Sequence, residues 1–267
     1  SASDLGLLDR QSRAARDWPG AGMSLNLQRF GLVIISVIGL LGFVWPLWLP
    51  QGVSADSTSG WLALTLLPLL AIAALWFAQG KLAGPRQIAL LGLLAAVAAA
   101  TRIATSGVGG FELIFVVVIL GAAALGARFG FLLGASAILL SSLFFGGVGP
   151  WTAFQMFAVG WVGAGAGLLG SYLDKRLKSW QLAIYAAVAA YLFGLIMNLW
   201  FWPFAVGPQT SISFDGDASL GQNLVSFLAY SLVSSTLTWD TARAVSSAVL
   251  ILLIGKPFMQ TLRRYKF

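Results

Sequence analysis

The sequence contains no cysteine and no histidine. These absences exclude disulfide bonds and a histidine-dependent serine protease, and they remove the usual ligands of zinc and haem. We therefore predict no metal site and no cofactor. Charged residues are also scarce, at 9% of 267 residues, whereas a soluble domain contains about 25%. A water-soluble surface cannot be built from so few charges, which predicts a protein embedded in a lipid bilayer.

Apolar residues, in contrast, make up 58% of the chain. A helix needs about 20 apolar residues to cross the hydrocarbon core of a bilayer, and several segments meet this requirement. They are 30–49, 61–79, 86–104, 111–127, 129–145, 151–173, 179–202 and 240–260. These segments predict an all-α integral membrane protein with eight spans.

The positions of the basic residues predict the orientation. With eight spans and a cytoplasmic N-terminus, fourteen of the sixteen Lys and Arg residues lie on the cytoplasmic side, as the positive-inside rule requires. The net charge of +7 thus reflects membrane orientation and not a nucleic-acid partner. A ninth span at 223–238 would place the basic C-terminal tail outside. We therefore expect that stretch to lie on, or dip into, the outer side, with an extension of the last helix as the alternative.

The chain divides into three parts by composition. Residues 1–29 form a polar cytoplasmic tail without the early apolar core of a cleavable signal peptide. Residues 30–80 form an accessory two-helix hairpin, and residues 85–264 form a six-helix core with an outer insert at 203–238. No internal repeat is evident, so a secondary transporter built from inverted repeats is not supported.

Small residues at four-residue spacing occur in two places. Gly130 with Gly134 and Gly163 with Gly167 predict close contact between helix backbones. A GxGxxG match at 165–170 lies inside a membrane helix with no preceding strand, so it does not indicate a dinucleotide site. In the segment 86–104, Ala95 with Ala99 and Ala96 with Ala100 form similar pairs. Their spacing favours internal packing, with docking of another protein as the alternative.

Two arginines, Arg102 and Arg243, depart from the charge rule and lie near the outer helix ends. Charges at such depth usually face a partner or a cavity, and Glu112 and Asp240 are at the same depth. A structural ion pair and a polar rim around a ligand remain equally open. Aromatic and amide side chains and two glycine-rich loops, 106–110 and 146–150, cluster on the same side. The predicted ligand site comprises Arg102, Glu112, Trp151, Gln155, Asn198, Tyr230, Trp239, Asp240 and Arg243.

Two runs of sequence support a family assignment. The run Gly146-Gly-Val-Gly-Pro-Trp-Thr-Ala-Phe-Gln-Met156, preceded by Gly126-Ala-Arg-Phe-Gly130, resembles the S components of energy-coupling factor (ECF) transporters. The run Thr238-Trp-Asp-Thr-Ala-Arg243 resembles them as well, and the cobalamin-type branch is the most similar. The similarity covers roughly residues 86–264. The two extra helices and the long insert depart from the family pattern.

This resemblance implies a non-enzymatic importer subunit in the plasma membrane of a prokaryote, with both termini cytoplasmic. It would bind a vitamin, with cobalamin favoured, and dock on a transmembrane coupling subunit with two ATPases. By position, the family's alanine motif corresponds to Ala95 and Ala99, and next to Ala96 and Ala100. The alternatives are an ion-coupled secondary transporter and an intramembrane enzyme such as a prenyl transferase. The sequence places no acid at mid-membrane for a coupling ion and no clustered acids for magnesium diphosphate.

Overall fold

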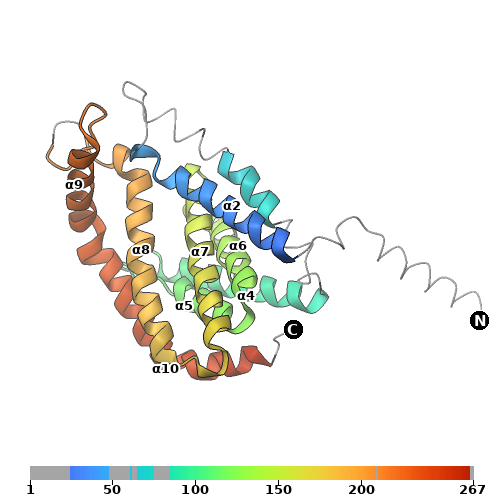
Figure 1. Ribbon diagram of the computed structural model, residues 1–267. Helices are drawn as coiled ribbons and strands as arrows, with labels where there is room; N and C mark the ends of the chain where they lie inside the picture. Colours follow the sequence, from blue (N-terminus) through green and yellow to red (C-terminus); the bar gives the residue numbers. More distant parts are fainter. Residues whose placement is uncertain (1–24, 48–60, 62–64, 75–83, 208–209, 265–267) are drawn as a thin grey trace, which may run out of the picture.

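The computed structural model describes residues 25–47, 61, 65–74, 84–207 and 210–264. All regular structure in these segments is helical (Figure 1), which confirms the predicted all-α membrane protein. Five of the described helices are long and apolar enough to cross a bilayer. They are α4 (Pro85–Thr105), α6 (Ala127–Phe144), α7 (Pro150–Leu173), α8 (Ser179–Ala205) and one continuous helix over Leu220–Arg263.

Three further apolar helices are shorter. They are Val33–Phe43 within α2 (Leu25–Phe43), the segment Thr65–Ala74, and α5 (Ile114–Leu125). The first two fall within the predicted hairpin, and the count of eight spans stays a prediction. The predicted tail of residues 1–29 lies almost wholly outside the described residues.

Helix α5 is short and lies at the centre of the core. Its 12 residues extend about 18 Å, well below the thickness of the hydrocarbon core, so the predicted span 111–127 is wrong in length. Residues 114–124 are all buried, because α4, α6, α7, α8 and α10 (Thr241–Arg263) pack around the helix. Its N-terminal end lies beside the end of α4 and the start of α10, and this arrangement brings side chains from several elements together there.

Helices α6 and α7 pack with their backbones in close contact, as the paired glycines predict. A methyl group at Gly163 would overlap the backbone carbonyl of Gly130, and one at Gly134 would overlap the carbonyl of Val159. Only glycine fits at such an approach, so the small-xxx-small interpretation is confirmed for this helix pair.

The stretch 223–238 does not form a separate helix on the membrane surface. Helix α9 (Leu220–Ser231), a π-helical segment (Leu232–Asp240) and α10 follow one another without a break and lie along α8 (Figure 1). The predicted surface helix is therefore wrong, and the alternative of an extended last helix is correct. The physical reason is that residues 222–254 contain neither proline nor glycine, so nothing in the sequence ends the helix.

Helix α2 packs directly on the core and crosses it obliquely (Figure 1). The Trp161 indole N–H of α7 donates to the Ser36 hydroxyl at 3.2 Å, and Gly39 lies against the Trp161 ring. Just beyond α2, the Trp45 indole N–H donates to the Trp200 carbonyl of α8 at 3.2 Å. These contacts fix α2 and the residues directly after it to α7 and α8.

Candidate functional site

Arg243 forms a buried ion-pair cluster in the first turn of α10. Its guanidinium donates to the Asp240 carboxylate at 2.7 Å and to the Glu112 carboxylate at 3.0 Å, and only 7% of its side chain is exposed. It also lies 4.9 Å from the centre of the Phe193 ring and 5.5 Å from that of Phe115. The cation is thus neutralised by two acids and two aromatic faces, so the pairing predicted for Arg243 is confirmed.

Asp240 is held by a chain of side chains from α8 and the π-helical segment. The Ser235 hydroxyl donates to its carboxylate at 2.8 Å, and the Asn198 amide donates to Ser235 at 2.6 Å. The carboxylate packs so closely on Gly194 that a methyl group there would overlap it. A π-helical turn is rare and often occurs at functional positions. Asn198 thus supports Asp240 through Ser235, and its predicted contact with a ligand stays a prediction.

Arg102 approaches the same region from the last turn of α4. Its two terminal nitrogens donate to the Ser141 hydroxyl of α6 at 2.8 Å and to the Gln155 side-chain oxygen of α7 at 3.0 Å. Both partners are uncharged, which distinguishes Arg102 from Arg243. The close backbone contact between α6 and α7 places Ser141 and Gln155 where one arginine reaches both.

Two small cavities open between these side chains. The first, about 170 Å³, is lined by Arg102, Glu112, Ile114, Ile138, Gln155, Val159, Phe193, Met197 and Arg243. The second, about 180 Å³, is lined by Arg102, Thr105, Ser106, Gly107, Val108, Gly110, Phe111, Glu112, Phe145 and Trp239. Arg102 and Glu112 border both cavities. A few polar groups among apolar walls are typical of a small-molecule site, so this is the candidate site.

A glycine-rich loop closes the second cavity. Gly107, Gly109 and Gly110 all have positive φ angles, between 30° and 83°, which side chains rarely adopt. At Gly110 a methyl group would also overlap the Trp239 carbonyl. The loop therefore sits directly on the end of the π-helical segment, and this close approach places Glu112 beside Arg243.

The structure separates the nine predicted site residues into two groups. Five line the cavities, namely Arg102, Glu112, Gln155, Trp239 and Arg243. Trp151 is 41% exposed at the start of α7, and Tyr230 packs with Trp202 and Phe227 beneath the insert. The described insert residues border neither cavity, and these two cavities lie beside the 106–110 loop; the ligand site expected under 203–238 stays a prediction.

The sequence did not predict the apolar walls of the first cavity, nor the Ser141 hydroxyl that accepts from Arg102. Phe193, Met197 and Val159 lie within long apolar stretches, where spacing does not distinguish cavity walls from ordinary core. Ser141 offered a usable signal, because a hydroxyl in an apolar membrane helix commonly forms a contact between helices.

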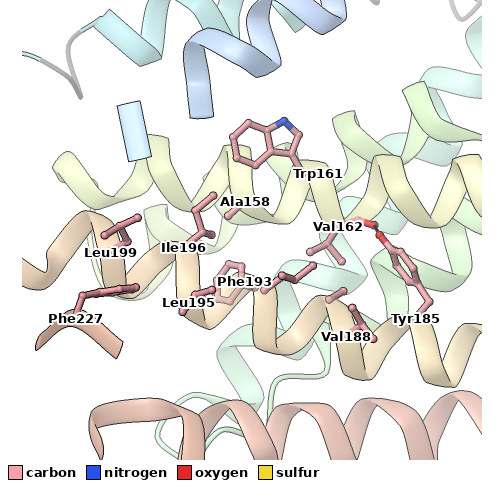
Figure 2. Close-up of a pocket in the computed structure, with 12 residues that line it drawn as sticks. Ala158, Trp161, Val162, Tyr185, Val188, Phe193, Leu195, Ile196, Leu199 and Phe227 are labelled. Atoms are coloured by element: carbon pink, nitrogen blue, oxygen red, sulfur yellow. Dashed lines mark hydrogen bonds between the residues drawn. The ribbon is translucent and has the colours of Figure 1, made fainter. Parts of the chain in front are cut away.

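A larger apolar groove lies between α7 and α8 (Figure 2). It measures about 420 Å³, and its lining includes Trp161, Tyr185, Val188 and Phe227 but no charged residue. The Tyr185 hydroxyl donates to the Val162 carbonyl at 2.6 Å. The groove therefore suits hydrocarbon and not a polar molecule, and Phe193 forms a wall common to it and the first polar cavity.

The alanine pairs on α4 face opposite ways. Ala95 and Ala99 are 1% and 5% exposed, because α4 packs there on α5 and α6. They cannot meet another protein, so their assignment as the first docking residues is wrong. Ala96 and Ala100 are exposed, and an added methyl group at Gly92 would meet no atom within 4 Å. The accessible stripe of small residues therefore consists of Gly92, Ala96 and Ala100.

Comparison with known proteins gives one match. The family model described as ECF transporter, substrate-specific component, matches residues 86–255, from the first turn of α4 to about two thirds of the way along α10. No curated protein and no solved structure matches the chain significantly.

Proposed function

The chain belongs to the substrate-specific components of ECF transporters, and from this we propose that it binds a small vitamin-like molecule at the outer face of a prokaryotic plasma membrane. Members of this family are membrane-embedded transporter subunits, not enzymes, and they work with a transmembrane coupling subunit and ATPases. The bound molecule is then delivered inward through that complex.

The observation that carries this proposal is the pair of polar cavities at one end of the bundle. Charged and amide groups from α4, α7 and α10, together with Glu112, converge there beside the apolar walls of α6 and α8. Both acids of this region, Glu112 and Asp240, contact Arg243. Neither is poised to bind a coupling ion at mid-membrane, so the structure gives no support to an ion-coupled transporter.

The cavity volumes bear on the identity of the ligand. Cobalamin, favoured by the sequence resemblance, is far larger than cavities of about 170 and 180 Å³. Together these cavities reach the lower end of the range for small-molecule pockets, about 300–1,000 Å³. We therefore favour a smaller ligand. Native mass spectrometry of the gently purified protein tests this directly, and a co-purifying corrinoid would contradict it.

The proposed orientation predicts a labelling result. Ser211 lies in the loop after α8, and Ser179 begins α8 beside three basic residues at 175–178. A cysteine at Ser211 should react with a membrane-impermeant maleimide in whole cells, whereas one at Ser179 should react only after lysis. The chain has no native cysteine, so the background is low. Labelling of the Ser179 variant alone in intact cells would indicate the opposite topology.

Gln155 and Trp151 provide a matched test of the binding site. Gln155 lines the first cavity, while Trp151, one turn earlier on α7, lines neither cavity. Gln155→Ala should weaken binding about ten- to hundredfold, because a buried hydrogen bond contributes roughly 1–3 kcal/mol. Trp151→Ala should change affinity less than threefold or so, since its ring is largely outside the site. Equilibrium binding of the co-purifying molecule in detergent measures the affinity of both variants. An equal loss of affinity in the two variants would place the binding site nearer to Trp151 at the start of α7.

A further inference from the structure

The two arginines of the site differ in how their charge is balanced. Arg243 has two carboxylates within 3.0 Å, whereas Arg102 donates to the neutral Ser141 and Gln155. Among the described residues, no carboxylate forms an ion pair with Arg102. The cluster of Glu112, Arg243 and Asp240 therefore carries one net negative charge, and this charge balances the positive charge of Arg102 beside it.

The Arg102 guanidinium keeps N–H donors for a further acceptor, because Ser141 and Gln155 each accept only one of its five N–H groups. An arginine inside a membrane protein normally has an anionic or carbonyl partner, because removing the cation from water is costly. The planar donor fork of arginine matches the two oxygens of a carboxylate. Since Arg102 borders both cavities, an anion in either of them would lie within its reach.

We infer, resting on the proposed transport function, that Arg102 binds the carboxylate of the transported molecule. The side-chain oxygen of Gln155 accepts from Arg102, which leaves its amide N–H₂ to donate to the same carboxylate in the first cavity. The ligand is therefore a small carboxylic acid, and its ionised group accepts from the N–H groups of Arg102 that Ser141 and Gln155 leave unused.

Glu112 restricts the rest of the ligand. One of its oxygens accepts from Arg243, and its side chain, 32% exposed, borders both cavities beside Arg102. It favours an N–H or O–H donor on the ligand and repels a second carboxylate. The walls formed by Ile138, Val159 and Met197 suit hydrocarbon. The expected ligand is thus a monocarboxylate with a donor group and a short apolar portion.

Paired compounds test the carboxylate requirement on the full-length protein. Nicotinate, pantothenate and biotin are each compared with a neutral counterpart, namely nicotinamide, panthenol and biotin methyl ester, with cationic thiamine as a further probe. Isothermal titration in detergent should show binding of at least one acid, about ten- to hundredfold tighter than its counterpart. Preferential binding of a neutral or cationic compound overturns the carboxylate inference but leaves the transport function standing. Binding of none of the seven contradicts the carboxylate inference, and native mass spectrometry of the purified protein tests the transport function separately.

Variants of Arg102 assign the effect to this residue. Arg102→Gln keeps a hydrogen-bonding side chain without charge, so it should remove most of the preference for the acid. Arg102→Lys retains the charge without the planar donor fork. Its preference for the acid should therefore lie between that of the unaltered protein and that of Arg102→Gln. Arg86→Gln, 16 positions earlier on α4 and exposed, is the control and should bind as the unaltered protein does. Undiminished acid preference in a folded Arg102→Gln variant would overturn the inference.

Discussion

Replacing Asp240 by asparagine is expected to destabilise the protein by about 3–5 kcal/mol, the usual effect of removing one partner from a buried ion pair. The side chain is 1% exposed and lies 2.7 Å from the Arg243 guanidinium, so the lost charge cannot be replaced by water. Arg243 would then have only one ion-pair partner, the partly exposed carboxylate of Glu112. For a chain of this size the change corresponds to a midpoint of thermal unfolding roughly 6–20 °C lower.

Two further variants separate the ion pair from a general effect of substitution. Asp217→Asn changes an exposed carboxylate in the loop between α8 and α9 and should leave the midpoint within a degree or so. Adding Arg243→Met to Asp240→Asn removes the stranded cation, so the double variant should recover part of the loss. The interpretation fails if Asp240→Asn unfolds at the same temperature as Asp217→Asn.

The general architecture was predictable because its signals are local. Apolar length and glycines four residues apart each depend on a short stretch of chain. The length of α5 was not predictable in the same way, because the apolar segment 111–127 has the composition of a full span. Its helix begins at Ile114 because the glycine-rich loop before it packs onto Trp239, a contact between residues far apart in sequence.

The site was predictable in part for a related reason. Arg102, Glu112, Asp240 and Arg243 were grouped correctly, because helix ends on one side of a membrane share a depth. Their pairing depends on side-chain geometry, which spacing does not encode. The same limit applies to the alanines of α4, since Ala95 with Ala99 and Ala96 with Ala100 have identical spacing. Only the packing of α5 and α6 shows which pair is covered.

The exposed stripe on α4 is the surface where we expect the coupling subunit to dock. Gly92, Ala96 and Ala100 leave the backbone of α4 open to close approach by another helix. An apolar groove of about 850 Å³ lies between the start of α4 and the end of α10, and its lining includes Leu93 and Phe258. By helical spacing Leu93 shares a face with Ala96 and Ala100, so the groove and the stripe form one surface.

Ala96→Trp and Ala100→Trp should therefore reduce ATP-dependent uptake by more than about tenfold, because an indole ring keeps the two helices apart. Ligand binding to the isolated protein should be unchanged, since both residues lie outside the polar cavities.

Two control variants accompany this test. Val188 on α8 is 53% exposed, so Val188→Trp places the same ring on another exposed surface and should preserve uptake. Ala95→Trp should instead lower stability by overpacking the core. Normal uptake by the Ala96 and Ala100 variants, with the coupling subunit and ATPases co-expressed, would exclude this face as the docking surface.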